Sequence, residues 1–272
     1  MSDLVALRGD LAAMAQAFSV VEPVPSVTDQ LLHLPGRSLR LRTYGESPDL
    51  LVWFHGGGYV TGSIDAVDPL CRSLAVRSGR TVVSVGYRLA PEHPFPSAYD
   101  DALAALAAIA SRPGVRSVAL GGDSAGGGLA AAVAQTTTVP LDALLLLCPF
   151  LDLTFSCPSV RDQPVDSLLP LSALRQFADL YGGDVRDPRV SPLLGPLDAL
   201  PPVAVVTGGL DPLRDEAALF VLGVQAAGGT ATHQRWPDVP HGFPGMTAVL
   251  PEADEALRWA CGQLTRTAQT PG

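Results

Sequence analysis

Hydrophobic positions change their pattern about 80 residues into the chain. Residues 3–18 carry apolar side chains at helical spacing and predict an amphipathic helix, and two prolines in Val21–Ser26 indicate a linker after it. Three strands are then expected, separated by Pro-Gly and Ser-Pro turn signals, at Val27–Leu34, Leu39–Tyr44 and Leu50–Phe54. The first two of these strands are predicted to pair as a hairpin.

Beyond residue 80, short apolar runs alternate with helical repeats. Buried strands are predicted at Thr81–Val85, Ser117–Leu120, Leu144–Cys148, Val203–Thr207 and Thr230–Trp236. Helices are predicted across residues 99–109, at Ala125–Gln135 and Arg214–Ala227, and from Pro251 onward. Continuous apolar strands that alternate with helices form a mostly parallel sheet covered on both faces, so we expect an α/β fold.

One long segment interrupts this alternation. Leu153–Leu200 is rich in proline, glycine and aspartate, and only Leu171–Tyr181 within it has a helical pattern. An insertion of that length inside a compact fold is typical of a lid or cap. Because one sheet accounts for the whole chain, residues 1–272 are predicted to form a single domain.

Composition narrows the possible functions. The chain has 272 residues, of which 47% are hydrophobic and 17% charged, as in a globular protein. Its formal net charge of −9 disfavours a nucleic-acid or anionic-membrane partner, since both would repel it. Every basic residue is arginine, which excludes Schiff-base and P-loop lysine chemistry.

The sequence also predicts a compartment. The N-terminus carries acidic residues early and lacks the basic start and apolar core of a secretory signal, and no apolar run is long enough to span a bilayer. Cys71, Cys148, Cys157 and Cys261 show no C-x-x-C spacing and are interpreted as buried small hydrophobes in a reducing environment. We therefore expect a soluble cytoplasmic protein.

The strongest chemical signal is the Gly-Asp-Ser-Ala-Gly sequence centred on Ser124, between a predicted strand and a predicted helix. A serine on so tight a strand-to-helix turn projects its hydroxyl from the sheet, and side chains two residues away would collide, which explains both glycines. The helix that begins at Ala125 also aims its free N–H groups at this point. Ser124 is the predicted nucleophile.

A serine hydroxyl needs a base near neutral pH, and that base needs an orienting acid. His241 follows the last predicted strand, in a loop expected at the carboxyl edge of a parallel sheet, where sites form. His33 and His233 fall within predicted strands, and His55 and His93 precede Ser124 in the chain. His241 is therefore the predicted general base.

The acid is expected between Ser124 and His241, in the order known for α/β hydrolases. Asp211 begins the loop that follows the strand at Val203–Thr207. Asp215 and Glu216 read as acids of the first helical turn, and Asp238 is too close in sequence to His241 to orient its ring from the far side. Asp211 is the predicted acid.

A third element directly follows the strand at Leu50–Phe54, in the sequence His55-Gly56-Gly57-Gly58. Consecutive glycines let backbone N–H groups turn toward a substrate oxygen where a Cβ would block its approach. The N–H groups of Gly57, Gly58 and Ala125 are predicted to form a three-donor oxyanion hole. His55 and Gly56 are expected to support this loop.

These motifs together resemble the hormone-sensitive-lipase-like family of α/β-hydrolase carboxylesterases, in the subgroup whose nucleophile motif reads G-D-S-A-G. The matching stretches are His55–Val60, Tyr87–Pro96, Gly122–Gly127, Ser191–Leu194, Asp211–Glu216 and His241–Phe243, and the resemblance runs from about residue 39 to the end of the chain. It implies an eight-stranded sheet, a small helical cap built from about residues 1–25 and 153–200, and the site residues named above. It also implies that the stretch around His93 and Glu92 is structural.

The chain departs from the family pattern at three places. Gly86 stands where an aspartate is usual, so a polar side chain near the site is expected to be missing. Gly128 stands where asparagine is common, which is expected to loosen helix packing. The N-terminal region is short, so the cap is expected to be small and the acyl pocket open.

The resulting hypothesis is a serine carboxylesterase that hydrolyses short- to medium-chain esters without a metal or organic cofactor. The predicted pocket residues are those of the helix at 4–18 together with Phe150, Phe155, Leu168, Leu169, Phe177, Leu180 and Tyr181. The same triad also serves amidases, lactonases and carbamate hydrolases, which the sequence separates poorly from esterases. A non-catalytic binding protein, as in the plant gibberellin receptor, is disfavoured because His241 is present. The resemblance further suggests a homodimer that forms through the sheet edge near the last strand.

Overall fold

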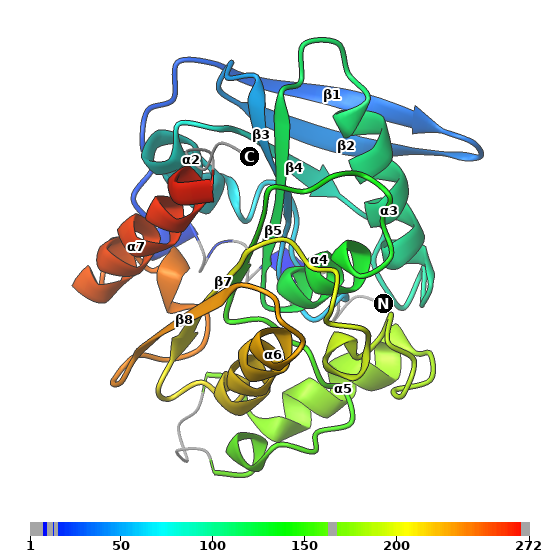
Figure 1. Ribbon diagram of the computed structural model, residues 1–272, viewed down its shortest axis with the longest axis vertical. Helices are drawn as coiled ribbons and strands as arrows, with labels where there is room; N and C mark the ends of the chain where they lie inside the picture. Colours follow the sequence, from blue (N-terminus) through cyan, green and yellow to red (C-terminus); the bar gives the residue numbers. More distant parts are fainter. Residues whose placement is uncertain (1–7, 10–12, 14–15, 163–167, 268–272) are drawn as a thin grey trace.

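Eight strands form one sheet in the computed structural model, which describes residues 8–9, 13, 16–162 and 168–267 (Figure 1). Along the sheet the order is β1-β2-β4-β3-β5-β6-β7-β8. The strands are β1 (Val27–Leu34), β2 (Arg37–Tyr44), β3 (Asp49–Phe54), β4 (Thr81–Gly86), β5 (Ser117–Asp123), β6 (Ala143–Leu147), β7 (Val203–Gly208) and β8 (Ala231–Trp236). All eight predicted strands are confirmed, with ends shifted by at most three residues.

The sheet is mostly parallel, as predicted. β1 and β2 form an antiparallel hairpin around a turn in which Gly36 has a φ of +74°. β2 is also antiparallel to β4, and every other neighbouring pair is parallel. The carboxyl ends of β3, β5, β7 and β8 therefore meet at one edge of the sheet, where the loops that follow them come together.

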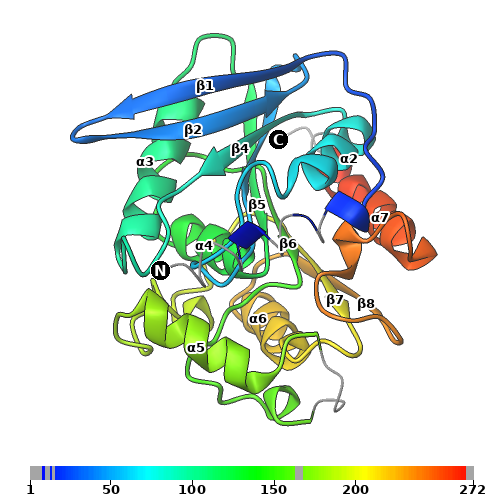
Figure 2. The same cartoon turned by 180° about the vertical axis from the view of Figure 1, so that it is seen from behind.

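Helices cover both faces of the sheet (Figures 1 and 2). One buried cluster joins α3, α4 and α6 to side chains such as Val52 and Phe54, and a second joins α2 and α7 to Leu51 and Trp53. The helices are α2 (Asp68–Ser78), α3 (Ser97–Ala110), α4 (Ala125–Ala134), α5 (Leu171–Tyr181), α6 (Arg214–Ala226) and α7 (Pro251–Thr267), with short 3₁₀ turns η1 (Pro158–Val160), η2 (Pro192–Leu194) and η3 (Phe243–Gly245). The sequence pattern did not predict α2, because its two arginines and its proline obscure the buried side.

In its described residues, the predicted insertion carries one α-helix, α5, and packs onto the loops of the sheet. Tyr181, at the end of α5, stacks on Tyr59 with ring centres 3.9 Å apart and meets the edge of Phe95. Of the predicted N-terminal helix, residues 8–9, 13 and 16–17 are helical. Its apolar positions Leu4, Leu7, Leu11 and Met14 lie outside the described residues.

Two other expectations concern membranes and cysteines. Within the described residues, no helix combines the length and the apolar character needed to cross a bilayer. All four cysteines are free thiols and are buried, as the sequence predicted.

The two unusual glycines lie in close contacts. Gly86 pairs with Arg40 at the end of β4, and a Cβ at Gly86 would lie 3.1 Å from the Arg40 carbonyl oxygen. At Gly128 a Cβ would lie only 2.1 Å from the carbonyl oxygen of Phe150 and 2.7 Å from the hydroxyl of Tyr59. The expectation that Gly128 loosens helix packing was therefore wrong: its missing side chain lets α4 approach the chain after β6.

Gly128→Ala should destabilise the protein although alanine favours helices. The added methyl group has no room, and overpacking of this kind costs about 1–3 kcal/mol of unfolding free energy. Gly262→Ala is the matched control, because a Cβ at this position in α7 meets no atom within 4 Å. The control should gain about 0.4–1 kcal/mol. Urea unfolding of both variants measures the difference, and equal stabilisation would contradict the packing argument.

Candidate active site

Ser124 lies on a strained turn between β5 and α4. Its backbone has φ 53° and ψ −121°, and residues other than glycine rarely adopt such a positive φ. A Cβ at Gly122 would lie 2.2 Å from the Gly126 carbonyl oxygen, and one at Gly126 would lie 2.0 Å from the Phe54 carbonyl oxygen. As predicted, both positions of the motif require glycine, because a neighbouring backbone carbonyl leaves no room for a Cβ.

Ser124, His241 and Asp211 form a continuous chain of hydrogen bonds. His241 Nε2 lies 2.9 Å from Ser124 Oγ, and His241 Nδ1 lies 2.9 Å from Asp211 Oδ2. The other carboxylate oxygen of Asp211 accepts the Leu213 N–H at 2.8 Å, which fixes the acid at the start of α6. Because a carboxylate only accepts, Nδ1 donates to Asp211 and Nε2 is left to accept the serine proton.

The charge of Asp211 controls the titration of His241. Burial lowers the pKa of His241, while the Asp211 charge and hydrogen bond raise it, and the net effect is a pKa above the usual value. The Asp211 carboxylate is fully buried and the His241 side chain is 12% exposed. The imidazole is thus a stronger base than a free histidine, with one face open to the cavity.

The alternative acids serve other purposes. Asp215 accepts the Ser159 N–H at 2.9 Å and so ties η1 to the first turn of α6. Glu216 is fully buried and accepts the Leu151 N–H, and its burial raises its pKa well above the usual value. Both are first-turn helix acids, as predicted.

The remaining histidines lie elsewhere. His33 pairs with Ser38 in the β1–β2 hairpin, and His233 on β8 lies 2.7 Å from the Thr207 hydroxyl. His93 is exposed on the segment before α3.

The loop after β3 holds its peptide planes in fixed directions. His55 Nδ1 donates to the Gly56 carbonyl at 2.8 Å, and the trans peptide then points the Gly57 N–H the opposite way. His55 is fully buried and stacks on Tyr87 with ring centres 4.3 Å apart, and burial lowers its pKa to about 4. His55 is therefore neutral near pH 7 and orients a peptide.

The next peptide is held more strongly. The Gly57 carbonyl accepts the Val60 N–H at 3.1 Å, the Thr61 N–H at 2.8 Å and the Thr61 hydroxyl at 2.9 Å. The Gly58 N–H, on the other side of the same peptide plane, is aimed by these three bonds. Within the described part of the chain, the N–H groups of Gly57, Gly58 and Ala125 have no protein acceptor.

Asp123 is a functional neighbour that sequence reasoning missed. Its carboxylate accepts the Gly56 N–H at 3.0 Å and the Trp53 indole N–H at 3.1 Å, and burial raises its pKa to about 6. Asp123 is next to Ser124 in the sequence, but its contact with Gly56 depends on the pairing of β3 with β5, which the sequence does not reveal. Thr61 was missed for the same reason, since nothing local marks its hydroxyl as a partner of Gly57.

Ser124 and His241 open into a cavity of about 470 Å³. Phe150, Leu168, Leu169 and Phe177 line it as predicted, and Phe18 and Ser19 do so from the N-terminal segment. The sequence did not predict the contributions of Ala66, Val67 and Leu70 at the start of α2 or of Pro244 and Met246 around η3. Their side chains make the cavity predominantly apolar.

Of the seven pocket residues predicted between Phe150 and Tyr181, three do not line this cavity. Tyr181 is buried against Tyr59, and Phe155 packs beside Phe150 with ring centres 6.1 Å apart. Leu180 packs against the core on the same helix as Tyr181. For Leu180 and Tyr181, helical periodicity could not distinguish the side of α5 that faces the core from the side that faces the cavity, because both sides are apolar.

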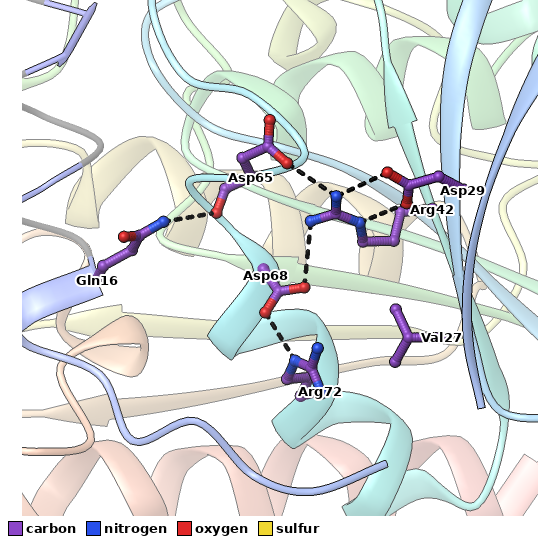
Figure 3. A pocket seen from close by; sticks show the side chains of 7 residues that line it. All are labelled: Gln16, Val27, Asp29, Arg42, Asp65, Asp68 and Arg72. Carbon is purple, nitrogen blue, oxygen red and sulfur yellow. Dashed lines mark hydrogen bonds and ion pairs between the residues drawn. The ribbon is translucent and has the colours of Figure 1, made fainter. Parts of the chain in front are cut away.

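A second hollow on the surface differs in character (Figure 3). Arg42 at its centre pairs with Asp29, Asp65 and Asp68, and Arg72 pairs with Asp68. These pairs offset most of the charge of the three carboxylates at the hollow and tie the β1–β2 hairpin to α2. The cavity at Ser124 is thus the candidate site.

One group of side chains near the site has ligand atoms close enough for a metal. Among the described residues, Cys148, Asp211 and His241 place such atoms within 4.8 Å of one another. Two of them already share the hydrogen bond of the triad, so an ion there would replace the proton on His241 Nδ1. Asp211 and His241 are therefore already paired with each other.

Comparison with known proteins identifies relatives with ester-hydrolysing activity. A family model described as alpha/beta hydrolase fold matches residues 51–245. Esterase LipI of Mycobacterium tuberculosis is 34% identical over 258 residues, covering 87% of this chain and 80% of that protein. Ethyl acetate hydrolase of Pseudomonas putida is 35% identical over 243 residues, covering 82% and 76%.

Solved structures agree with these relatives. The thermophilic carboxylesterase EstE1, cloned from a metagenomic library, superposes with a TM-score of 0.93 at 33% identity, covering 98% of each chain. The hyperthermophilic esterase of Pyrobaculum calidifontis superposes with a TM-score of 0.91 at 32% identity, covering 98% of this chain and 94% of that one.

Asp211→Asn should lower the pKa of His241 below that of a free histidine. The substitution removes the Asp211 charge, the largest effect that raises the pKa of His241, and leaves the burial that lowers it, against which only the weaker effect of the Asp123 charge remains. A pH titration of the His241 imidazole by NMR measures the shift. Asp215→Asn is the control, since Asp215 bonds to Ser159 and should leave the His241 titration unchanged. An unchanged His241 pKa in Asp211→Asn would contradict the assigned pairing.

Proposed function

This chain belongs to the α/β-hydrolase fold family, among its hormone-sensitive-lipase-like carboxylic ester hydrolases, and we propose that Ser124 is its nucleophile. His241 is the general base and Asp211 the acid that orients it. The N–H groups of Gly57, Gly58 and Ala125 form the oxyanion hole, with His55 and Gly56 as loop support. The observation that carries this proposal is the unbroken chain from Asp211 through His241 to Ser124, at the floor of an apolar cavity.

The reaction follows from these positions. As Ser124 Oγ attacks the ester carbonyl carbon, His241 Nε2 takes the hydroxyl proton, and the carbonyl oxygen becomes an oxyanion held by the three N–H groups. His241 then gives the proton to the leaving alkoxide, the ester C–O bond breaks, and an acyl-enzyme and an alcohol result. His241 next deprotonates a water that attacks the acyl carbon, and the proton returns to Ser124 as the carboxylic acid leaves.

The cavity favours neutral esters. Among its described lining residues, only Asp123 and His241 are ionisable, and both already have partners. A substrate carboxylate placed there would be buried without an arginine to pair it, at a cost of several kcal/mol. Uncharged acyl and alcohol groups are therefore the proposed substrate class.

The size of the cavity favours short to medium acyl chains. At ~30 Å³ for each methylene-sized group, about 470 Å³ holds roughly 16 such groups. p-Nitrophenyl butyrate has about 15 non-hydrogen atoms and the palmitate about 27, so by the same measure only the shorter ester fits the cavity.

We further propose that the chain is one domain with a cap built from about residues 1–25 and 153–200. Phe18, Leu168, Leu169 and Phe177, from the described parts of both segments, line the cavity beside the catalytic loops. A cap of this composition excludes water from the reacting ester and sets the available volume.

Initial rates on p-nitrophenyl esters from acetate to palmitate test the function. We expect a maximum at short or medium chains, much slower hydrolysis of the charged hemisuccinate ester, and slower cleavage of the butyryl p-nitroanilide. Ser124→Ala should lower turnover about a millionfold. Unchanged turnover in that variant would overturn the assignment of the nucleophile, and a maximum at palmitate would overturn the assignment of the pocket. Faster cleavage of the anilide than of the ester would favour an amidase.

The edge of the sheet supports a proposed homodimer. β8 pairs only with β7 in the described structure, so no strand binds the backbone N–H and C=O groups on its other side, where the Ala231 carbonyl accepts the Gln225 side-chain amide. A second copy that adds its own β8 would satisfy them. Light scattering coupled to size-exclusion chromatography should give twice the chain mass at micromolar concentration, and a monomer mass there would reject the dimer.

A further inference from the structure

Arg8, far from Ser124 in sequence, holds the loop that carries the oxyanion hole. Its Nε donates to the Val60 carbonyl at 2.8 Å, and Nη2 donates to the Ala90 carbonyl at 3.0 Å. Nη1 and Nη2 also donate to the two carboxylate oxygens of Glu92, both at 2.8 Å. Four of the five N–H groups of one guanidinium thus bind three positions on two loops.

Glu92 keeps the guanidinium in this position. The hydrogen bond from Arg8 lowers the pKa of Glu92 to about 2, so the pair is ionised throughout the neutral range. The two loops are also joined directly, because the Ala90 N–H donates to the Tyr59 carbonyl at 2.9 Å. Arg8 therefore binds two loops that already contact each other, and one of them is the turn from Gly57 to Thr61.

The contact at Val60 leads to the oxyanion hole through two peptide planes. In a trans peptide the C=O and the following N–H point in opposite directions, and both peptides concerned are trans. Arg8 binds the Val60 carbonyl on one side, and on the other side the Thr61 N–H donates to the Gly57 carbonyl at 2.8 Å. The far side of the Gly57 peptide is the Gly58 N–H.

We propose that Arg8 is a positioning residue of the oxyanion hole, acting through Val60–Thr61 and Gly57–Gly58. A charged donor polarises the Val60 peptide, which strengthens the bond of the Thr61 N–H to Gly57 and in turn the donor character of the Gly58 N–H. The same chain of bonds restrains Gly57 and Gly58, which have no side chains of their own to restrain them. The inference rests on the oxyanion hole proposed above.

This arrangement couples catalysis to the docking of the N-terminal segment. Arg8 belongs to the same segment as Phe18 and Ser19, which line the substrate cavity. The segment thus covers the substrate and, through Arg8, holds the Gly58 N–H in the direction that the transition state needs.

The test compares steady-state kinetics of Arg8→Ala with those of Arg258→Ala. Arg258 forms an exposed ion pair with Asp254 on α7, away from the site, so its variant controls for the loss of a surface arginine. Arg8→Ala should lower kcat about tenfold, a fraction of the 10²–10³ lost with an entire oxyanion donor. KM should change less than twofold, since the oxyanion exists only in the transition state.

A role in seating the N-terminal segment alone would produce the opposite pattern, a raised KM with unchanged kcat, and that result overturns the inference. Guanidinium ion at ~10 mM, well below denaturing concentrations, should restore part of kcat in Arg8→Ala and none in Arg258→Ala. Should Arg8→Ala fail to fold, as judged by circular dichroism, Arg8→Lys is measured by the same criteria.

A double-mutant cycle with Thr61→Val tests the route. Thr61→Val removes the hydroxyl that the Gly57 carbonyl accepts and leaves the N-terminal contacts intact. If Arg8 acts through this carbonyl, the two losses in kcat combine to less than their product. Fully multiplicative losses overturn the route. Unchanged kcat in Arg8→Ala while Ser124→Ala is inactive rejects the role of Arg8 alone, whereas an active Ser124→Ala rejects the proposed function itself.

Discussion

The site depends on the close approach of two loops at glycines, which carry no side chain to hold the loops apart. β3 and β5 are parallel neighbours, and the loops that follow them leave the sheet at the same edge. Gly126 lies against the carbonyls of Phe54 and His55, and Gly56 lies against Asp123, each at a distance that a Cβ would make impossible. This contact places Ser124 beside the loop that carries Gly57 and Gly58. A side chain at Gly56 or Gly126 would move the proposed nucleophile away from the proposed oxyanion hole.

Buried polar groups around this contact work mainly by orienting peptides. His55, made neutral by burial, donates to one carbonyl of the loop, and the Asp123 carboxylate accepts an N–H from it. Asp211 acts on the His241 side chain, and its charge more than offsets the burial that would weaken His241 as a base. The electrostatic stabilisation available to a transition state is thus fixed in advance, in a cavity with few other polar groups.

Local patterns in the sequence predicted the fold, and they singled out the three side chains that the structure joins by hydrogen bonds, since each of these features has a local cause. Strand runs, the glycines around Ser124 and the chain order of Ser124, Asp211 and His241 are visible in short windows. Contacts across the fold were not visible there. Asp123 meets Gly56 across 67 positions and Arg8 meets Val60 across 52, and no pattern marks either pair. The prediction for Gly128 was wrong because it did not include Phe150. The Phe150 carbonyl lies so close to Gly128 that the missing side chain lets α4 approach the chain after β6.

Besides lining the cavity, the proposed cap restrains the glycine turn beside Ser124. Glycines lose more conformational freedom on ordering than any other residue, so a glycine turn is poorly ordered unless groups outside it restrain it. The turn at Gly57 and Gly58 is restrained from two sides: Phe177 of α5 lies over Gly58, where a Cβ would come within 2.4 Å of the ring, and Arg8 binds Val60. Both restraints come from the segments proposed as the cap. Loss of either restraint should therefore reduce transition-state stabilisation. Changes in the cap that alter substrate fit therefore also act on the proposed oxyanion hole, because the same segments hold its glycine turn in place.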